Sequence, residues 1–156
     1  MADTVELDSV TRALLSELQK DARQTNKALA EKVGVAPSTC LERVRELQTR
    51  GLIRGFRAVV DPASVGRPME AILSIQQRAA QRHAIETLME DCAARPETVR
   101  VMALTGTTDF IVHAAVRDME HLRDLVWSLT ERREVARVQS SLVFARVEGS
   151  EMLPLD

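Results

Sequence analysis

The sequence predicts an α+β protein made of two domains, a helical one followed by one that contains a β-sheet. Three observations lead to this fold class. The first 50 residues carry apolar side chains at the three- and four-residue spacing of amphipathic helices. Residues 69–147 alternate between strand-like and helix-like segments. Between these parts, residues 61–68 include two prolines, a glycine and a serine, a composition typical of a linker.

Three helices are predicted for the first domain. The first follows Asp8, whose carboxylate can cap a helix, and runs to about Lys20. The second follows Thr25 and ends at Gly34, because glycine readily adopts the left-handed conformation found after helices. The third begins at Pro37, since proline is favoured at the first helical position. The residues expected to face inward are Val10, Leu14, Leu15 and Leu18, then Leu29, Ala30 and Val33, and finally Cys40, Leu41, Val44 and Leu47.

The second and third helices, joined by a short turn, have the pattern of a helix-turn-helix, whose second helix lies in the major groove of DNA. Polar side chains near the start of that helix can bond phosphates or base edges. An ordinary helical hairpin with a solvated charged face would show the same pattern. If the motif binds DNA, the expected contacts come from Ser38, Thr39, Glu42 and Arg43.

Residues 52–61 carry apolar and β-branched side chains on both sides of Arg54 and Gly55, which predicts two short strands with a tight turn. This would be the wing of a winged helix-turn-helix. Arg54 and Arg57 can contact phosphates from the wing, or can simply be solvated. The net charge of −2 is unevenly spread, with ten Lys/Arg against eight Asp/Glu in residues 1–60 and eleven against fifteen afterwards. A basic excess in the first domain is consistent with binding DNA.

The second domain shows the order βαββαβ. Its strand signals cover residues 69–77, 98–104, 110–116 and 135–147, and its helix signals cover 83–94 and 119–130. This order predicts a C-terminal ferredoxin-like domain, with helices on one face of an antiparallel sheet. About 80 residues with one sheet face uncovered bury little apolar surface, so we expect that face to contact another copy. The expected boundaries are 1–60 for the first domain, 61–67 for the linker and 68–156 for the second domain.

The sequence offers no convincing catalytic or metal-binding set. The spacing of His83, His113 and His121 does not suit a metal, and neither Cys40 nor Cys92 completes a site with them. There is no P-loop, dinucleotide-binding glycine motif or nucleophile elbow. We therefore expect no catalytic residue, metal or cofactor. No apolar run approaches the roughly 20 residues of a membrane helix, and the N-terminus lacks the features of a signal peptide, so we expect no membrane partner and a cytoplasmic protein.

The loop 105–109, with the sequence Thr-Gly-Thr-Thr-Asp, is the strongest candidate for a small-molecule site. Gly106 permits close approach of a ligand, and Asp109 can pair with an ammonium group. Backbone N–H groups or threonine hydroxyls can receive a carboxylate. These properties suit a free amino acid. A plain hairpin turn explains the same residues, and the residues alone favour the turn.

The run VGVAPSTCLERVRELQTRGLIRGF, residues 33–56, resembles the DNA-binding domain of the Lrp/AsnC family, the leucine-responsive and asparagine-responsive regulators. Residues 7–34 and the motif GTTDF at 106–110 match the family as well, and the resemblance extends from about residue 7 to about residue 155. It implies a bacterial or archaeal type of transcription regulator that binds double-stranded DNA. It also implies homodimers formed through the second domain and often assembled into octamers.

The resemblance further implies an amino-acid effector bound at the loop 105–109, at an interface between subunits. By matching position, the site would consist of Ala103, Gly106, Thr107, Thr108, Asp109, Ser140, Leu142 and Val143. Threonine is usual in the family where Ser140 stands, and an aromatic residue is frequent where Ser141 stands, so the identity of the effector stays open. Two rivals are an enzyme or small-molecule carrier built on the ferredoxin-like half, and a nucleoid-architectural protein that binds DNA without an effector.

Overall fold

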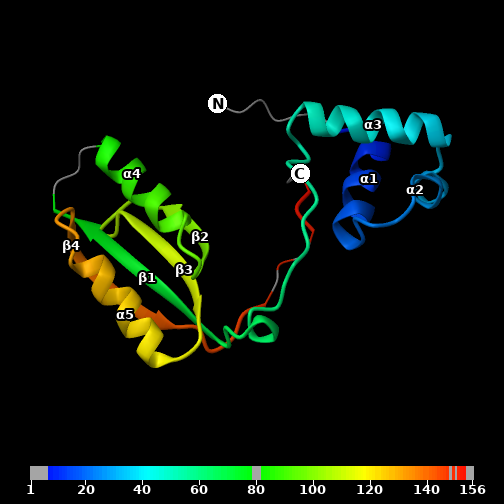
Figure 1. The fold of residues 1–156 in the computed structure, drawn as a ribbon. Helices are drawn as coiled ribbons and strands as arrows, with labels where there is room; N and C mark the ends of the chain where they lie inside the picture. Colours follow the sequence, from blue (N-terminus) through cyan, green and yellow to red (C-terminus); the bar gives the residue numbers. More distant parts are fainter. Residues whose placement is uncertain (1–6, 79–81, 148, 150, 154–156) are drawn as a thin grey trace. The chain divides into compact units, whose positions relative to one another are not determined.

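The computed structural model describes residues 7–78, 82–147, 149 and 151–153. The chain divides into two compact units, which are described separately (Figure 1). The first unit comprises residues 1–58 together with 148–156, and the second comprises residues 59–147. The C-terminal segment thus belongs to the same unit as the N-terminal helices, although it follows the last strand in the sequence.

The first unit contains three helices, namely α1 (Ser9–Lys20), α2 (Asn26–Val33) and α3 (Pro37–Thr49). Their ends follow from local sequence, as predicted. The Asp8 carboxylate accepts a hydrogen bond from the Thr11 N–H at 2.7 Å and caps α1. The Thr25 hydroxyl accepts one from the Ala28 N–H at 3.2 Å and caps α2. Gly34, with a φ of 72°, ends α2 in the left-handed conformation. The predicted helix-turn-helix is confirmed.

A small apolar core holds these helices together. Leu14 and Cys40 have no exposed surface, and Leu29 and Ala30 are almost fully buried. Burying one leucine side chain contributes about 1.5–3 kcal/mol, so this cluster supplies much of the unit's stability. The partly buried side chains packed around it are Val10, Leu18, Val33, Val35 and Val44.

Two predictions for this unit are wrong. Leu41 is 40% exposed rather than inward-facing, because the buried stripe of α3 follows Cys40, Val44 and Leu47, and Leu41 lies about 100° around the helix from Cys40. The wing strands predicted for residues 52–61 are not formed, since the described backbone there contains no strand. A two-stranded ribbon without further partners is only marginally stable, which accounts for the extended segment found in its place.

The second unit has the predicted βαββαβ order. Its elements are β1 (Met69–Gln77), α4 (Arg82–Ala93), β2 (Thr98–Ala103), β3 (Phe110–Val116), α5 (Met119–Thr130) and β4 (Val135–Leu142). All strand pairs are antiparallel and the sheet order is β2-β3-β1-β4, the arrangement of a ferredoxin-like fold. Asp118 caps α5 by accepting a hydrogen bond from the His121 N–H at 2.8 Å. The α+β fold class is therefore confirmed.

The core of this unit lies between the sheet and its two helices (Figure 1). Alternate residues of β1 and β3 face it, because successive side chains of a strand point to opposite faces. Leu73 is paired with Val112 on one side and with Ser140 on the other, which fixes the register at the centre of the sheet. The core residues are Ala71, Leu73, Ile75, Leu88, Cys92, Phe110, Val112, Ala114, Val116, Leu122, Leu125, Leu129 and Val135.

The last strand is shorter than predicted, ending at Leu142 instead of Val147. Its partner β1 runs out at this point. The Val143 N–H still donates to the Glu70 carbonyl at 2.9 Å, but β1 begins at Met69 after a proline, which has no N–H to offer. The predicted linker is also not featureless, because Ala63–Val65 form a turn of 3-10 helix.

The sheet face away from the helices carries a cluster of polar side chains joined by hydrogen bonds. Glu70 and His113 lie on neighbouring strands, with 2.7 Å between Glu70 Oε2 and His113 Nε2. Arg146 Nη1 donates to the same carboxylate oxygen at 3.0 Å. The side chains of Glu70 and His113 are less than one-fifth exposed, so the cluster is well shielded within a single chain. No helix among the described residues is long and apolar enough to span a bilayer.

Candidate functional site

The start of α3 is held in place by contacts that leave its polar side chains outward. Ala36 makes no side-chain cap, but Pro37 is at the first turn, where its missing N–H costs nothing. The Asn26 side-chain amide donates to the Pro37 carbonyl at 2.8 Å, which ties the beginning of α2 to the beginning of α3. Cys40 and Leu47 are buried on the inner side of α3. The helix therefore presents a fixed outer face.

Three of the residues predicted to contact DNA lie on that outer face. Ser38, Thr39 and Glu42 are all exposed. Within the described part of the chain, none of their side chains makes a hydrogen bond or an ion pair. Hydroxyl groups in this state are available to phosphates and base edges, and a carboxylate can accept a hydrogen bond from cytosine.

Arg43, the fourth residue of α3 predicted to contact DNA, already has partners within the chain. Its side chain is 34% exposed, and Nη1 lies 2.6 Å from Asp8 Oδ2 and 3.1 Å from the Thr11 hydroxyl. Hydrogen bonds from Thr11 and from Arg43 lower the pKa of Asp8 to about 2. Arg43 therefore links α3 to the beginning of α1. To contact a base, the guanidinium must either leave the Asp8 carboxylate or use N–H groups that do not bond this carboxylate.

The structure adds two residues to the outer face that the sequence reasoning missed. Leu41 and Arg45 are exposed, and they stand three and seven residues after Ser38, so they share its side of the helix. Arg45 has no described side-chain partner, in contrast to Arg43. Its spacing from Ser38 and Glu42 was the signal that could have identified it. An exposed apolar side chain such as Leu41 can contact a thymine methyl group.

The remaining predicted DNA contacts lie in the extended segment after α3. Arg54 and Arg57 are exposed, and neither side chain makes a hydrogen bond or an ion pair among the described residues. They are not presented by a wing, because the strands are absent. The segment still places two unpaired guanidinium groups in the unit that contains the helix-turn-helix, where they can contact phosphates.

The histidines are accounted for by ordinary pairing. His113 bonds Glu70, and His121 Nε2 lies 2.9 Å from Glu97 Oε1. Burial alone would raise the pKa of Glu97, but the hydrogen bond to His121, a backbone hydrogen bond and the attraction of His121 and Arg95 together leave that pKa below its usual value. The side chain of His83 lies outside the described part of the structure. Among the residues described, no group of three or more His, Cys, Asp or Glu side chains could hold a metal.

The loop between β2 and β3 is tied to the end of β1. Asp109 Oδ2 accepts a hydrogen bond from the Gln77 N–H at 2.7 Å, and the Asp109 N–H donates to the Ile75 carbonyl at 3.0 Å. The Gln76 side chain contacts the Thr107 carbonyl. The sequence suggested a free carboxylate at Asp109, but this carboxylate already accepts a hydrogen bond from the backbone. Oδ2 fixes the loop, and the other carboxylate oxygen makes no hydrogen bond among the described residues.

The loop has room for close approach. Gly106 has a φ of 109°, in the region that favours glycine, and a Cβ placed there would meet nothing within 4 Å. Thr107 is exposed and Thr108 is half-buried. Ala103 pairs with Phe110 at the base of the loop and is exposed. This group of residues forms one half of the predicted effector site.

The other half lies elsewhere on the sheet. Leu142 pairs with Ala71, and the Val143 N–H bonds the Glu70 carbonyl, whereas Asp109 bonds Ile75 near the opposite end of β1. The rise per residue of a strand separates Leu142 and Val143 from Asp109 by about 10–20 Å along the strand direction. The two strand spacings between β3 and β4 add about 10 Å across the sheet. Ser140, level with Leu73, is also on β4. A single chain therefore does not bring the two halves together.

Comparison with known proteins agrees with both units. Residues 7–54 match the family model of the winged helix-turn-helix DNA-binding domain, and residues 70–153 match that of the Lrp/AsnC ligand binding domain. The chain is 42% identical over 146 residues to the HTH-type transcriptional regulator AldR of Mycobacterium tuberculosis, covering 93% of this chain and 82% of AldR. It is 30% identical over 151 residues to the leucine-responsive regulatory protein of Rhizobium meliloti, covering 96% and 97% of the two chains.

A solved structure is similar over almost the whole chain. It is that of a transcriptional regulator from Neisseria meningitidis in complex with L-Met, with a TM-score of 0.87 and 32% sequence identity. The similarity covers 97% of this chain and 98% of the other.

Proposed function

This chain belongs to the Lrp/AsnC family of transcription regulators, and on that premise we propose that its DNA binding or its assembly responds to a free amino acid. It is a regulator with a helix-turn-helix DNA-binding unit and a ligand-binding unit, and not an enzyme. The observation that carries the proposal is the L-Met complex of the relative from Neisseria meningitidis, whose fold matches over nearly the whole chain.

For DNA recognition, we propose that Ser38 and Thr39 of α3 contact base edges and phosphates, and that Glu42 accepts a hydrogen bond from a base edge. Arg54 and Arg57 supply phosphate contacts, which add affinity and salt dependence but no sequence information. Arg43 belongs to this set as well, but its bonds to Asp8 and Thr11 give it a second role in fixing α3. The exposed residue Arg45 is added for its unpaired guanidinium.

For the effector, the proposed site joins the loop 105–109 of one copy to Ser140, Leu142 and Val143 of another. The separation of these groups on one sheet supports a site shared between copies. The unbonded Asp109 oxygen would accept from the ligand ammonium group, and the loop N–H groups would receive its carboxylate. Ala103, Leu142 and Val143 would offer an apolar wall. A small aliphatic amino acid suits this set best.

A site shared between copies requires assembly. The sheet face away from the helices carries half-buried Ile72 and Ile111, which another copy would cover. We propose a homodimer formed through this unit, with further assembly to an octamer following from the family resemblance. Light scattering on the full chain tests this point, and a monomer at micromolar concentration would contradict it.

The effector is tested by calorimetry with each of the twenty amino acids, followed by gel shifts on a promoter fragment with the binder present. The expected result is one amino acid, or a few, that bind at or below millimolar concentration and change DNA affinity or particle size. That change requires different affinities for two assembly states. If none binds, and DNA binding is salt-dependent without preference for one site, the chain acts as a nucleoid-architectural protein instead.

A further inference from the structure

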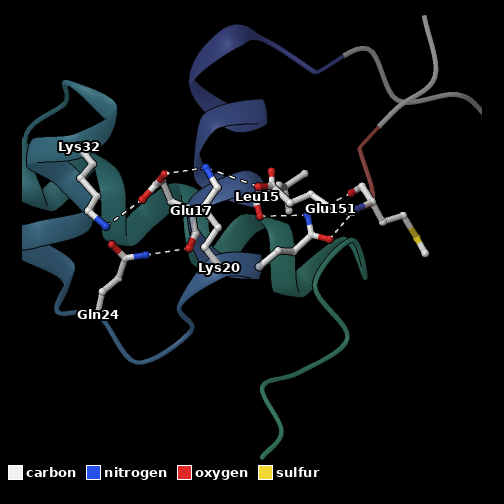
Figure 2. A network of polar contacts seen from close by, with 8 residues as sticks. Leu15, Glu17, Lys20, Gln24, Lys32 and Glu151 are labelled. Atoms are coloured by element: carbon white, nitrogen blue, oxygen red, sulfur yellow. Dashed lines mark hydrogen bonds and ion pairs between the residues drawn. The ribbon is translucent and has the colours of Figure 1, made fainter. Parts of the chain in front are cut away.

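The amide side chain of Gln19 on α1 binds the backbone of the C-terminal segment. The Met152 N–H donates to Gln19 Oε1 at 2.7 Å, and Gln19 Nε2 donates to the Met152 carbonyl at 3.1 Å. Gln19 Nε2 also donates to the Leu15 carbonyl at 3.1 Å, which holds the amide in place on α1 (Figure 2). One amide thus satisfies both backbone groups of Met152, much as a neighbouring β-strand would.

Charged groups extend this contact into the helical unit. Lys20 Nζ lies 3.5 Å from Glu151 Oε1 and 3.2 Å from Glu17 Oε1, and the other oxygen of Glu17 lies 2.9 Å from Lys32 Nζ (Figure 2). The hydrogen bond to Glu17, followed by the attraction of Glu151, raises the pKa of Lys20. The network therefore connects the C-terminal segment, α1 and α2. Each exposed pair contributes little alone, but together they select one position for the segment.

The same segment borders an apolar hollow of about 550 Å³ in the first unit. Its walls are Leu15 and Leu18 of α1, the stretch 52–57, and Leu153. This stretch is where a wing was predicted and not found. Its described backbone has one hydrogen bond to α3, from the Ile53 N–H to the Leu47 carbonyl at 3.1 Å. Its apolar side chains consequently depend on α1 and on the C-terminal segment for shelter from water.

We propose that residues 151–153 form a C-terminal strap that the DNA-binding unit needs in order to hold the stretch 52–57 against α1. In this proposal, the strap supports the stretch 52–57 in place of the second strand that a wing would have supplied. Because Arg54 and Arg57 lie in that stretch, releasing the strap lets them move away from their positions and weakens DNA binding. This second step rests on their proposed phosphate contacts. The structural step does not depend on those contacts.

Two variants of the full chain remove the strap in different ways. One lacks residues 151–156, and the other carries Gln19→Ala, which removes both bonds to Met152 while alanine favours the helix. Gln48→Ala is the matched control, since Gln48 is an exposed glutamine of α3 with no described side-chain partner. A double variant, Arg54→Ala with Arg57→Ala, removes the phosphate contacts and keeps the strap.

Hydrogen exchange and gel shifts on the same promoter fragment give the two readouts. We expect the Ile53 amide to exchange about fivefold faster or more in both strap variants, because its hydrogen bond to the Leu47 carbonyl opens more easily, with unchanged exchange in β1 and β3. DNA affinity should fall about three- to tenfold, equivalent to losing one or two net hydrogen bonds. The control should behave as the wild type.

The strap proposal is overturned if the Ile53 amide exchanges at the wild-type rate in both variants. Its second step is overturned if DNA affinity in the strap variants stays within twofold of the control although the double arginine variant binds DNA more weakly. The double arginine variant distinguishes a failure of the strap proposal from a failure of the proposed phosphate contacts. If it binds DNA as the wild type does, Arg54 and Arg57 are not phosphate contacts, and the exchange result still decides whether the strap holds the stretch.

Discussion

A site shared between two copies makes a prediction that a site within one chain cannot match. Thr107→Glu places a carboxylate where the loop is proposed to receive the ligand carboxylate. Leu142→Glu places one in the proposed apolar wall, at the opposite end of the sheet. Both wild-type side chains are exposed, Leu142 by 41%, so neither substitution buries a charge within its own chain. Each variant alone should lose about tenfold or more in amino-acid affinity, equivalent to about 1.4 kcal/mol.

The decisive experiment mixes the two variants. Equal amounts are unfolded, combined and refolded, so that copies assemble at random. An intact site then needs the loop from a Leu142→Glu chain and the last strand from a Thr107→Glu chain. Each is present with even odds, so about a quarter of the sites should bind normally in a symmetric assembly. Calorimetry with the amino acid identified for the wild type reports this fraction as the stoichiometry of the tight sites.

Two results would refute the reasoning. A mixture with no tight sites would mean that the loop and the end of β4 act within one chain, against the separation of Asp109 from Leu142 along β1. Wild-type affinity in both single variants would mean that neither residue lines the site. Thr107→Ser and Leu142→Met serve as controls, and their mixture should retain all its sites.

Three further predictions concern the DNA-binding unit and the core. Arg45→Ala should weaken binding to a specific promoter site by about 1–3 kcal/mol, measured by gel shift, with particle size unchanged. Leu73→Ala should lower the free energy of unfolding by about 2–5 kcal/mol in urea titrations, because Leu73 is fully buried. The pKa of Asp8 is lowered from 3.8 to about 2, so its contribution to stability is present above pH 4 and is lost as the pH falls towards 2. Asp8→Asn should therefore lower the melting temperature at pH 7 and have a much smaller effect at pH 2.

Features decided by neighbouring residues were predictable from the sequence. The limits of β3 and α5 agree with the prediction residue for residue, because alternation and the Asp118 cap act over a few positions. The same holds for the left-handed Gly34. The helix-turn-helix and the order βαββαβ follow from such signals placed in sequence.

Features that depend on distant residues were not predictable in this way. Arg43 looks free on a helical projection, yet its partner Asp8 is 35 residues away. Asp109 looks like a ligand for an ammonium group, yet it bonds the backbone of Gln77, 32 residues away. The residues 52–57 have the composition of strands, but a strand requires a partner, and composition does not supply one. In each case the missing information was a contact between segments far apart in the chain.

The cluster of Glu70, His113 and Arg146 bears on how faithfully two copies would recognise each other. Two purely apolar sheet faces can pack in several registers, because the hydrophobic effect is not directional. Here both bonds end on one carboxylate oxygen, so the second oxygen still needs a donor once water is displaced. If a partner docked with its register shifted by one residue, that oxygen would be buried without a hydrogen-bond donor. The binding free energy would then be less favourable by about 1–3 kcal/mol, or more for a charged group. In the proposed dimer, the cluster would therefore favour one register of docking over the neighbouring ones.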